Sequence, residues 1–330
     1  MNLNIKLLKK LVKTYGPSSN EGPIRDQIID EIKDLVDEYS IDSLGSIIAR
    51  KKGTGKKIMI SAHMDQIGLM VTDIDKDGFI RFGNIGGISP SITLSQKVIF
   101  ENKTVGAVFS EPVEDLSKLK LENMYIDIGA KNKEDAEKLV SIGDICIYYS
   151  EFIDNEHVVF SSYLDDRVGC FVAIEALKNL KETDNDLYFV FSVQEEVGLR
   201  GAKTAAFNID PDFGIAIDVT AHGDTPKAER FAVGLHKGTA IKVKDNSIIT
   251  HPLVRNNLVE LAKKNDIKYQ MEVLEFGGTD SGAIQTTKEG VPSGVISIPT
   301  RYVHSTVEMA SKEDISNSIK LLTVYLEDAK

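Results

Sequence analysis

The sequence contains little cysteine. Its 330 residues include only Cys146 and Cys170, and each lies within an apolar run. Such sparse cysteines argue against a disulfide framework and are typical of a reducing compartment. Residues 1–13 also lack the unbroken apolar stretch and the small-residue cleavage site of a secretion signal. We therefore predict a cytoplasmic protein.

An excess of basic residues and long apolar segments are also missing. Asp and Glu number 50 against 39 Lys and Arg, which gives a formal net charge of -11. Nucleic-acid backbones and anionic membrane surfaces both reward Lys and Arg, so neither is an expected partner. No apolar run reaches the length of roughly 20 residues that a membrane-spanning helix needs. Small substrates suit this composition better.

The hydrophobic pattern changes twice along the chain. The first 66 residues combine helical spacing, as in Ile24, Ile28 and Ile32, with a short apolar strand. Alternating, glycine-rich sequence then follows, and from residue 162 apolar runs of strand length alternate with helical segments. We predict an α/β domain with a mostly parallel central sheet, formed by residues 1–66 and 162–330. A β-rich insert is expected at residues 67–161.

Polar residues follow directly after four of the predicted strands. These strands lie at residues 57–62, 187–193, 213–217 and 294–298. The carboxyl ends of parallel strands share one edge of a sheet, where open α/β folds build their sites. The polar residues expected to meet at that edge are His63, Glu195, Glu196, Asp218 and His304.

Asp165, with Asp166 beside it, precedes a predicted helix and adds a further carboxylate. Imidazole and carboxylate groups are usual ligands of zinc, so two histidines and several acids suit a pair of divalent ions. A lone histidine is more often a surface residue, but adjacent acids at a buried strand end carry a like-charge penalty that a metal relieves. Asp65 could hydrogen-bond the second ring nitrogen of His63. The pattern predicts a dinuclear metal site.

Two glycine-rich segments, at residues 83–87 and 277–282, lack the spacing of nucleotide-binding loops and are interpreted as turns. In the second segment, Asp280 and Gly278 are candidate substrate-binding residues. Asp280 either contacts a substrate amine at the mouth of the site or only shapes the turn. Ser281 lacks the Gly-x-Ser-x-Gly context of a nucleophile elbow, which argues against a serine hydrolase.

Several motifs, spread over nearly the whole chain, are jointly specific. They include Ala62-His63-Met64-Asp65, Leu164-Asp165-Asp166-Arg167, Val193-Gln194-Glu195-Glu196, Ile217-Asp218-Val219-Thr220 and Arg301-Tyr302-Val303-His304. With these motifs the sequence resembles the TET-type dinuclear metallo-aminopeptidases. That family includes glutamyl and deblocking aminopeptidases, and some of its members carry cellulase or endoglucanase labels.

The resemblance implies two divalent metal ions in each subunit, with zinc or cobalt favoured over manganese. Asp165 would bridge the two ions. His63 and Asp218 would complete the ligands of one ion, and Glu196 and His304 those of the other.

The resemblance also implies a mechanism and a fold. Glu195 would act as the general base that generates a hydroxide between the ions, and Asp65 would support His63 from behind. The hydroxide would attack the first peptide bond of a short peptide. The implied fold is a three-layer αβα peptidase domain interrupted by a small β-barrel used in subunit contacts. The implied assembly is a homo-oligomer, from a dimer to a tetrahedral dodecamer.

Alternative functions stay open from sequence. The same metal pair would serve a carboxypeptidase or an N-acyl amino-acid deacylase. An endoglucanase is less favoured because the chain has no Trp, the usual sugar-stacking residue, and a non-catalytic scaffold is least favoured because every ligand candidate is present. Gln66 stands where relatives usually have Glu, which leaves metal affinity and substrate preference open. Arg230 or Lys237 could favour acidic substrates.

Overall fold

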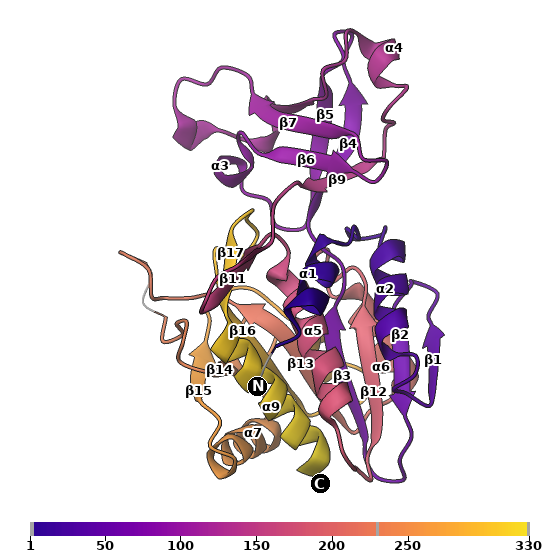
Figure 1. Cartoon of the computed structure of the whole chain (residues 1–330), viewed down its shortest axis with the longest axis vertical. Helices are drawn as coiled ribbons and strands as arrows, with labels where there is room; N and C mark the ends of the chain where they lie inside the picture. Colours follow the sequence, from indigo (N-terminus) through magenta and orange to yellow (C-terminus); the bar gives the residue numbers. More distant parts are fainter. Residues whose placement is uncertain (1–2, 229–230, 329–330) are drawn as a thin grey trace.

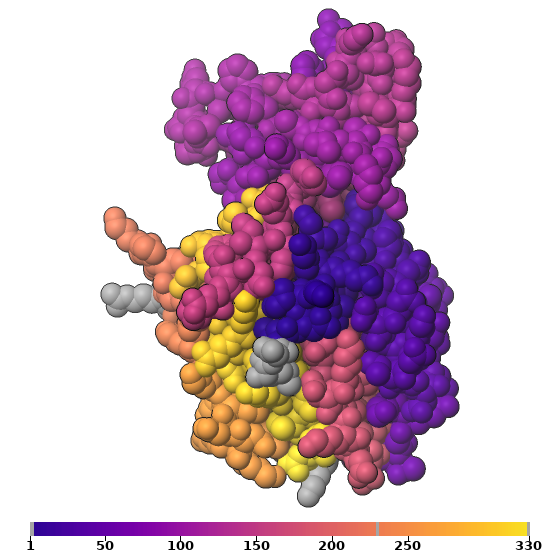
Figure 2. Space-filling model, in the orientation of Figure 1, coloured from indigo at the N-terminus to yellow at the C-terminus, as the bar shows by residue number. Residues whose placement is uncertain are grey.

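The computed structural model describes residues 3–228 and 231–328. A large α/β domain carries a smaller barrel at one end (Figure 1). Figure 2 shows the barrel as a lobe above the larger domain. No helix within the described residues is long and apolar enough to cross a membrane.

The central sheet has 11 strands within the described residues. Its four middle strands are parallel to one another, in the order β12 (Asp186–Ser192), β3 (Lys57–His63), β13 (Phe213–Thr220) and β16 (Ser293–Arg301). The flanking strands pair antiparallel with this centre or with one another, except that β15 pairs parallel with β14. They are β1 (Glu38–Ile41), β2 (Ile47–Lys51), β10 (Ile153–Asp154), β11 (Val158–Ser161), β14 (Thr239–Lys244), β15 (Tyr269–Val273) and β17 (Glu308–Ser311).

The middle strands are apolar on both faces because helices cover both sides of the sheet. In β3, Ile58, Ile60 and Ala62 join the core on one face, whereas Met59 joins a separate core on the other. Successive side chains of a strand point to opposite faces, so a strand buried on both sides is a continuous apolar run. This is the pattern that predicted the strands from sequence.

Helices form the two outer layers and confirm the three-layer αβα architecture. One layer contains α1 (Ile5–Lys13), α2 (Gly22–Ile32), α5 (Leu164–Asn179), α7 (Pro252–Lys264) and α9 (Lys312–Asp328). The opposite layer contains α6 (Arg200–Ile209) and α8 (Asp280–Gln285).

The barrel is closed, and all its strand pairs are antiparallel. Its strands are β4 (Gly68–Ile74), β5 (Ile80–Ile85), β6 (Lys97–Phe100), β7 (Val105–Ser110), β8 (Met124–Asp127) and β9 (Ile145–Tyr148), with short helices α3 (Pro90–Thr93) and α4 (Lys133–Ala136) and 3₁₀ turns η1 (Leu116–Lys118) and η2 (Leu121–Asn123) between them. Tyr15 and Tyr163, from the larger domain, pack into the barrel core. The Tyr15 hydroxyl donates to the Ile145 carbonyl oxygen at 3.0 Å. The barrel is therefore packed onto the α/β domain.

One predicted boundary differs from the structure. The insert was expected to extend to residue 161, but the strands of the barrel end at residue 148. Strands β10 and β11 instead join the central sheet, where β11 pairs with β17. A short alternating strand does not reveal which sheet will accept it, because its partner is distant in sequence.

Candidate active site

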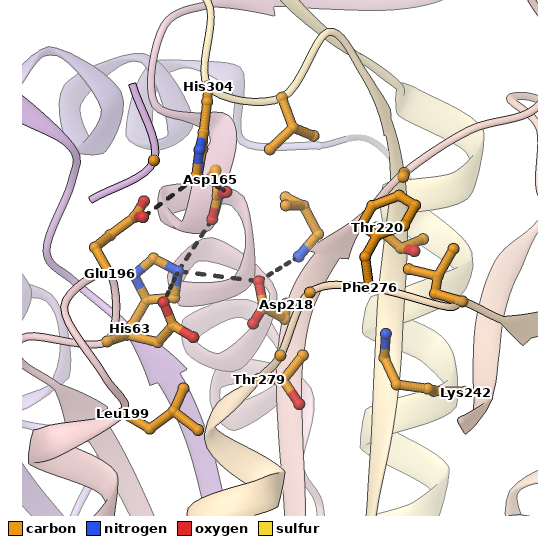
Figure 3. A pocket seen from close by; sticks show the side chains of 18 of the residues that line it. His63, Asp165, Glu196, Leu199, Asp218, Thr220, Lys242, Phe276, Thr279 and His304 are labelled. Carbon is orange, nitrogen blue, oxygen red and sulfur yellow. Dashed lines mark hydrogen bonds and ion pairs between the residues drawn. The ribbon is translucent and has the colours of Figure 1, made fainter. Parts of the chain in front are cut away.

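The residues predicted to meet at the strand ends all line one cavity of about 560 Å³ (Figure 3). His63 ends β3, and Asp218 lies near the carboxyl end of β13. Glu195 and Glu196 follow β12. The other two predicted residues are Asp165, at the start of α5, and His304, after β16. Five separate segments of the chain thus converge on this cavity.

Asp165 lies between the two histidines. Its Oδ1 is 3.0 Å from His63 Nε2, and its Oδ2 is 3.2 Å from His304 Nε2. Burial acts to raise the pKa of Asp165, but the hydrogen bonds from His304 and His63 outweigh burial and hold it below its usual range. The two carboxylate oxygens therefore face two different imidazoles.

Each imidazole also has a second carboxylate nearby. Glu196 Oε2 is 3.3 Å from His304 Nε2, and Asp218 Oδ1 is 3.9 Å from His63 Nε2. Burial raises the pKa of Glu196, and it raises that of Asp218 well above the ordinary value. The cluster thus divides into two halves that share Asp165.

This set of donors fits divalent cations. Two groups of side chains in residues 3–228 and 231–328 could each hold a metal ion, namely His63, Asp165 and Glu196, and His63, Asp166 and Asp218. The buried Glu196 Oε1 has no hydrogen-bond partner among the described residues. Nitrogen and oxygen donors without thiolates suit zinc, cobalt or manganese. An unsatisfied buried carboxylate oxygen is what a cation would stabilise.

Glu195 faces the cavity, and Asp65 lies behind it. Glu195 Oε2 is 3.9 Å from His63 Nε2, and burial raises the pKa of Glu195 well above its ordinary value. The Asp65 carboxylate accepts hydrogen bonds from the backbone N–H groups of Glu195 and Glu196, at 3.0 and 3.3 Å, and from the Ser18 hydroxyl at 2.7 Å. Its Oδ1 is 3.5 Å from His63 Nδ1. Asp65 therefore ties the loop after β12 to the loop after β3.

The family model for the M42 glutamyl aminopeptidases matches residues 45–321. The chain belongs to this family. This M42 peptidase is 56% identical over 317 residues to a protein of Acetivibrio thermocellus named as a candidate aminopeptidase, with 96% of each chain covered. It is also 40% identical over 339 residues to the lysyl aminopeptidase of Pyrococcus furiosus, with 98% of this chain and 97% of that protein covered.

Solved structures of other aminopeptidases and peptidases are similar in fold over nearly the whole chain. Aminopeptidase APDkam598 from the archaeon Desulfurococcus kamchatkensis has a TM-score of 0.95 at 40% identity, and the match covers 98% of this chain and 94% of that one. The Pyrococcus horikoshii TET1 peptidase, which can assemble into a tetrahedron or a large octahedral shell, has a TM-score of 0.88 at 34% identity. That match covers 98% of this chain and 99% of the other. The M42 chain is therefore a hydrolase of peptide bonds.

Glu308 was not predicted from sequence to belong to the M42 site. This buried β17 residue accepts hydrogen bonds from the backbone N–H of Asp165 at 3.1 Å and from that of His304 at 2.8 Å. Burial raises the pKa of Glu308 to about 8. It holds together the backbones of two candidate ligands from distant segments. No local motif marked it, because a single acid in a polar segment is common.

A turn of the barrel also contacts the site. Gly86 and Gly87 follow β5, and Gly87 lines the cavity. A Cβ atom at Gly87 would lie 2.8 Å from His304 Nδ1, and one at Gly86 would lie 2.8 Å from Glu196 Oε2. Both separations are too short for carbon, and Gly86 also has a positive φ of 73°. The turn thus requires glycine because the M42 insert approaches two candidate ligands.

The two predicted substrate-binding residues lie in different places. Gly278 lines the cavity, but Asp280 does not and is buried beneath it. The Asp280 Oδ2 accepts hydrogen bonds from the hydroxyls of Ser61 at 2.6 Å and Ser192 at 2.5 Å. These serines hold the carboxylate within the protein, which favours the structural role among the two left open for Asp280.

Two of the residues suggested to tune substrate preference, Gln66 and Lys237, do not line the cavity. Gln66 is buried, and its Oε1 accepts a hydrogen bond from the guanidinium of Arg167. Lys237 is exposed and does not line the cavity. Arg230 lies outside the described residues. The described part of the M42 chain therefore gives neither basic candidate a place beside the site.

Proposed function

We propose that this chain is an aminopeptidase that removes N-terminal residues from short peptides and uses two divalent ions, with zinc or cobalt favoured over manganese. The observation that carries the proposal is the position of Asp165. Its two oxygens face His63 and His304, and each histidine has at least one further carboxylate within 4 Å. A carboxylate shared by two such halves suits a dinuclear site.

In this proposal, each half of the cluster holds one ion. His63 and Asp218 complete one set of ligands, Glu196 and His304 complete the other, and Asp165 belongs to both. Two divalent ions, when bound, lower the pKa of a water molecule and polarise the carbonyl of the bond to be cut.

Glu195 is the proposed general base. It lines the cavity beside His63 and is not needed as a ligand in either half. Its carboxylate takes a proton from the attacking water and returns it to the departing amine, a role that contributes about 10²- to 10⁴-fold to rate. Asp65 fixes the backbone of Glu195 through the hydrogen bond at 3.0 Å and so orients the base.

We also propose that the chain forms a homo-oligomer, between a dimer and a tetrahedral dodecamer, with the barrel at residues 68–148 in subunit contacts. The assembly of the Pyrococcus horikoshii TET1 peptidase supports this idea, because its match spans nearly both chains. A cytoplasmic location belongs to the same proposal. It is supported by Cys146 and Cys170, which are both buried and unpaired.

The decisive experiment follows the products of a tripeptide with three different residues, such as Leu-Ala-Phe, by mass spectrometry at early times. The chelated protein should be inactive, and repletion with zinc, cobalt or manganese should release leucine first. Early release of phenylalanine would instead identify a carboxypeptidase. Equally fast cleavage of an N-acetylated dipeptide would identify a deacylase.

A further inference from the structure

The cavity has two chemically different ends. Figure 3 shows the proposed metal ligands on one side of the cavity and a wall with Phe276 and Lys242 on the other. The cavity lining also includes the apolar Val219 and Leu274. If the free amine and the first peptide bond lie at the ligands, the first side chain of the substrate extends along this wall. The wall therefore influences which N-terminal side chain of the substrate fits the cavity.

Lys242 is a buried ammonium held between two buried carboxylates. Its Nζ donates to Glu272 Oε1 and lies 3.2 Å from Asp245 Oδ2. The Thr220 hydroxyl also donates to Glu272 Oε1, at 2.7 Å. Burial acts to lower the pKa of Lys242, but the attraction of Glu272 and Asp245 outweighs it and raises the pKa. Lys242 is therefore charged and already paired.

The charge balance of this group disfavours a charged substrate side chain. One ammonium faces two carboxylates, so the carboxylate of an acidic first residue would become a third acid around a single cation. Removing that carboxylate from water without a free partner is costly. Away from the strand-end cluster, Lys242 is the only charged residue among the described residues that line the cavity. Because neither Glu272 nor Asp245 lines the cavity, a basic side chain would meet the ammonium there and find no free carboxylate on this wall.

We propose that the Lys242 group, formed by Lys242, Glu272 and Asp245, makes this enzyme select an uncharged first residue and reject acidic and basic ones. The inference rests on the proposed aminopeptidase function and names its substrate class. It departs from the glutamyl preference in the description of the family and from the lysyl preference in the name of the Pyrococcus furiosus relative.

The first test uses the unaltered, metal-replete protein and two pairs of p-nitroanilides that match in size but differ in charge. These pairs are glutamine with glutamate and methionine with lysine. We expect kcat/KM to be higher for the neutral member by on the order of tenfold in each pair. A glutamyl or lysyl substrate cleaved as fast as its neutral partner would overturn the inference. If none of the four p-nitroanilides is cleaved, the result would instead contradict the proposed aminopeptidase function.

The second test alters the charge of the group without altering its shape. Glu272→Gln keeps an oxygen for the Thr220 hydroxyl but leaves Lys242 with one carboxylate. We expect the ratio of kcat/KM for the glutamyl over the glutaminyl substrate to rise about fivefold or more. An unchanged ratio in a folded variant would overturn the role of the group. If the variant does not fold, the two wild-type pairs decide.

A matched control is available close by. Glu275 lies just after β15, three residues beyond the buried Glu272, but its side chain is 85% exposed and lies 3.9 Å from Lys244. Glu275→Gln removes the same charge from the surface, where water screens it. The substrate ratio of this control should match that of the unaltered enzyme. A shift equal to that of Glu272→Gln would show a general charge effect and overturn the inference.

Discussion

Two buried groups of charged side chains border the same cavity, and they balance their charge differently. Around Asp165, the carboxylates outnumber the imidazoles, and burial raises the pKa of Glu195, Glu196 and Asp218. At the Lys242 group, a side-chain ammonium already lies between two carboxylates. Beside its carboxylates the first group contains only imidazoles, whereas the second contains an ammonium within reach of both of its carboxylates.

This difference separates a site that requires a cation from a wall that only excludes charge. Burial alone does not distinguish the two groups, because each contains carboxylates that are buried, such as Asp165 and Asp218 in the first and Glu272 and Asp245 in the second. What distinguishes them is whether a lysine ammonium of the protein lies within reach of the carboxylates. Altering one partner at a time should therefore affect chemistry in the first group and stability in the second.

The largest effect should come from Glu195→Gln. Loss of the proposed base should lower kcat by about a thousandfold, while the metal content stays unchanged because Glu195 is not a proposed ligand. Steady-state kinetics with leucine p-nitroanilide and elemental analysis measure the two quantities. The exposed Glu289→Gln is the control. A fall in kcat of less than about tenfold would contradict the assigned role.

Lys242→Met should break the second group and destabilise the fold. Two carboxylates would remain buried without their cation, at a cost of about 3–5 kcal/mol in the free energy of unfolding. Urea denaturation at constant metal concentration measures this loss. Lys264→Met is the control, because Lys264 is 69% exposed and its ion pair with Asp328 spans 3.7 Å. Equal losses in the two variants would show that burial of Lys242 has no special effect.

Glu308→Gln should have a smaller effect, confined to metal binding. One of the two backbone N–H donors, from Asp165 or His304, would face an amide NH₂ instead of an acceptor oxygen. The dissociation constant for zinc should rise about tenfold, and excess zinc should restore activity. Competition with a chromophoric chelator measures the constant. An unchanged constant would limit Glu308 to a role in folding.

The smallest effect should occur at a partly exposed ion pair, that of Asp224 with Arg301. Burial acts to raise the pKa of Asp224, but the hydrogen bonds from Arg301 outweigh it and lower the pKa. The stabilisation is thus present above the ordinary pKa of about 3.9 and is lost as pH falls through the lower folded value. Asp224→Asn should cost about 1 kcal/mol at pH 7 and less at pH 3. Urea denaturation at both pH values checks this, and equal losses would exclude an electrostatic origin.

The strand ends could be predicted from sequence because of how the sheet is buried. Strands β3, β12 and β13 are covered on both faces, so their apolar runs are continuous and the polar residue after each run is conspicuous. His63 and Asp218 were found in this way. The roles of Asp165 as a bridge and Glu195 as a base came from the family resemblance.

Other parts of the site could not be predicted from local sequence patterns. Glu308 acts on Asp165 from 143 positions away, and Lys242 acquires its partner Glu272 from 30 positions away. The choice between the two roles left open for Asp280 depends on two serines in different strands. In each case, tertiary contacts decide the role, and neither spacing nor composition records them.

The glycine turn at Gly86 and Gly87 limits which other barrels could replace this one. Any grafted replacement would have to keep two successive positions without side chains, or a methyl group would push against His304 and Glu196. The loops on the far side of the barrel carry no such restriction from the cavity. Contact with the cavity therefore restricts the sequence at the base of the insert and not at its tip.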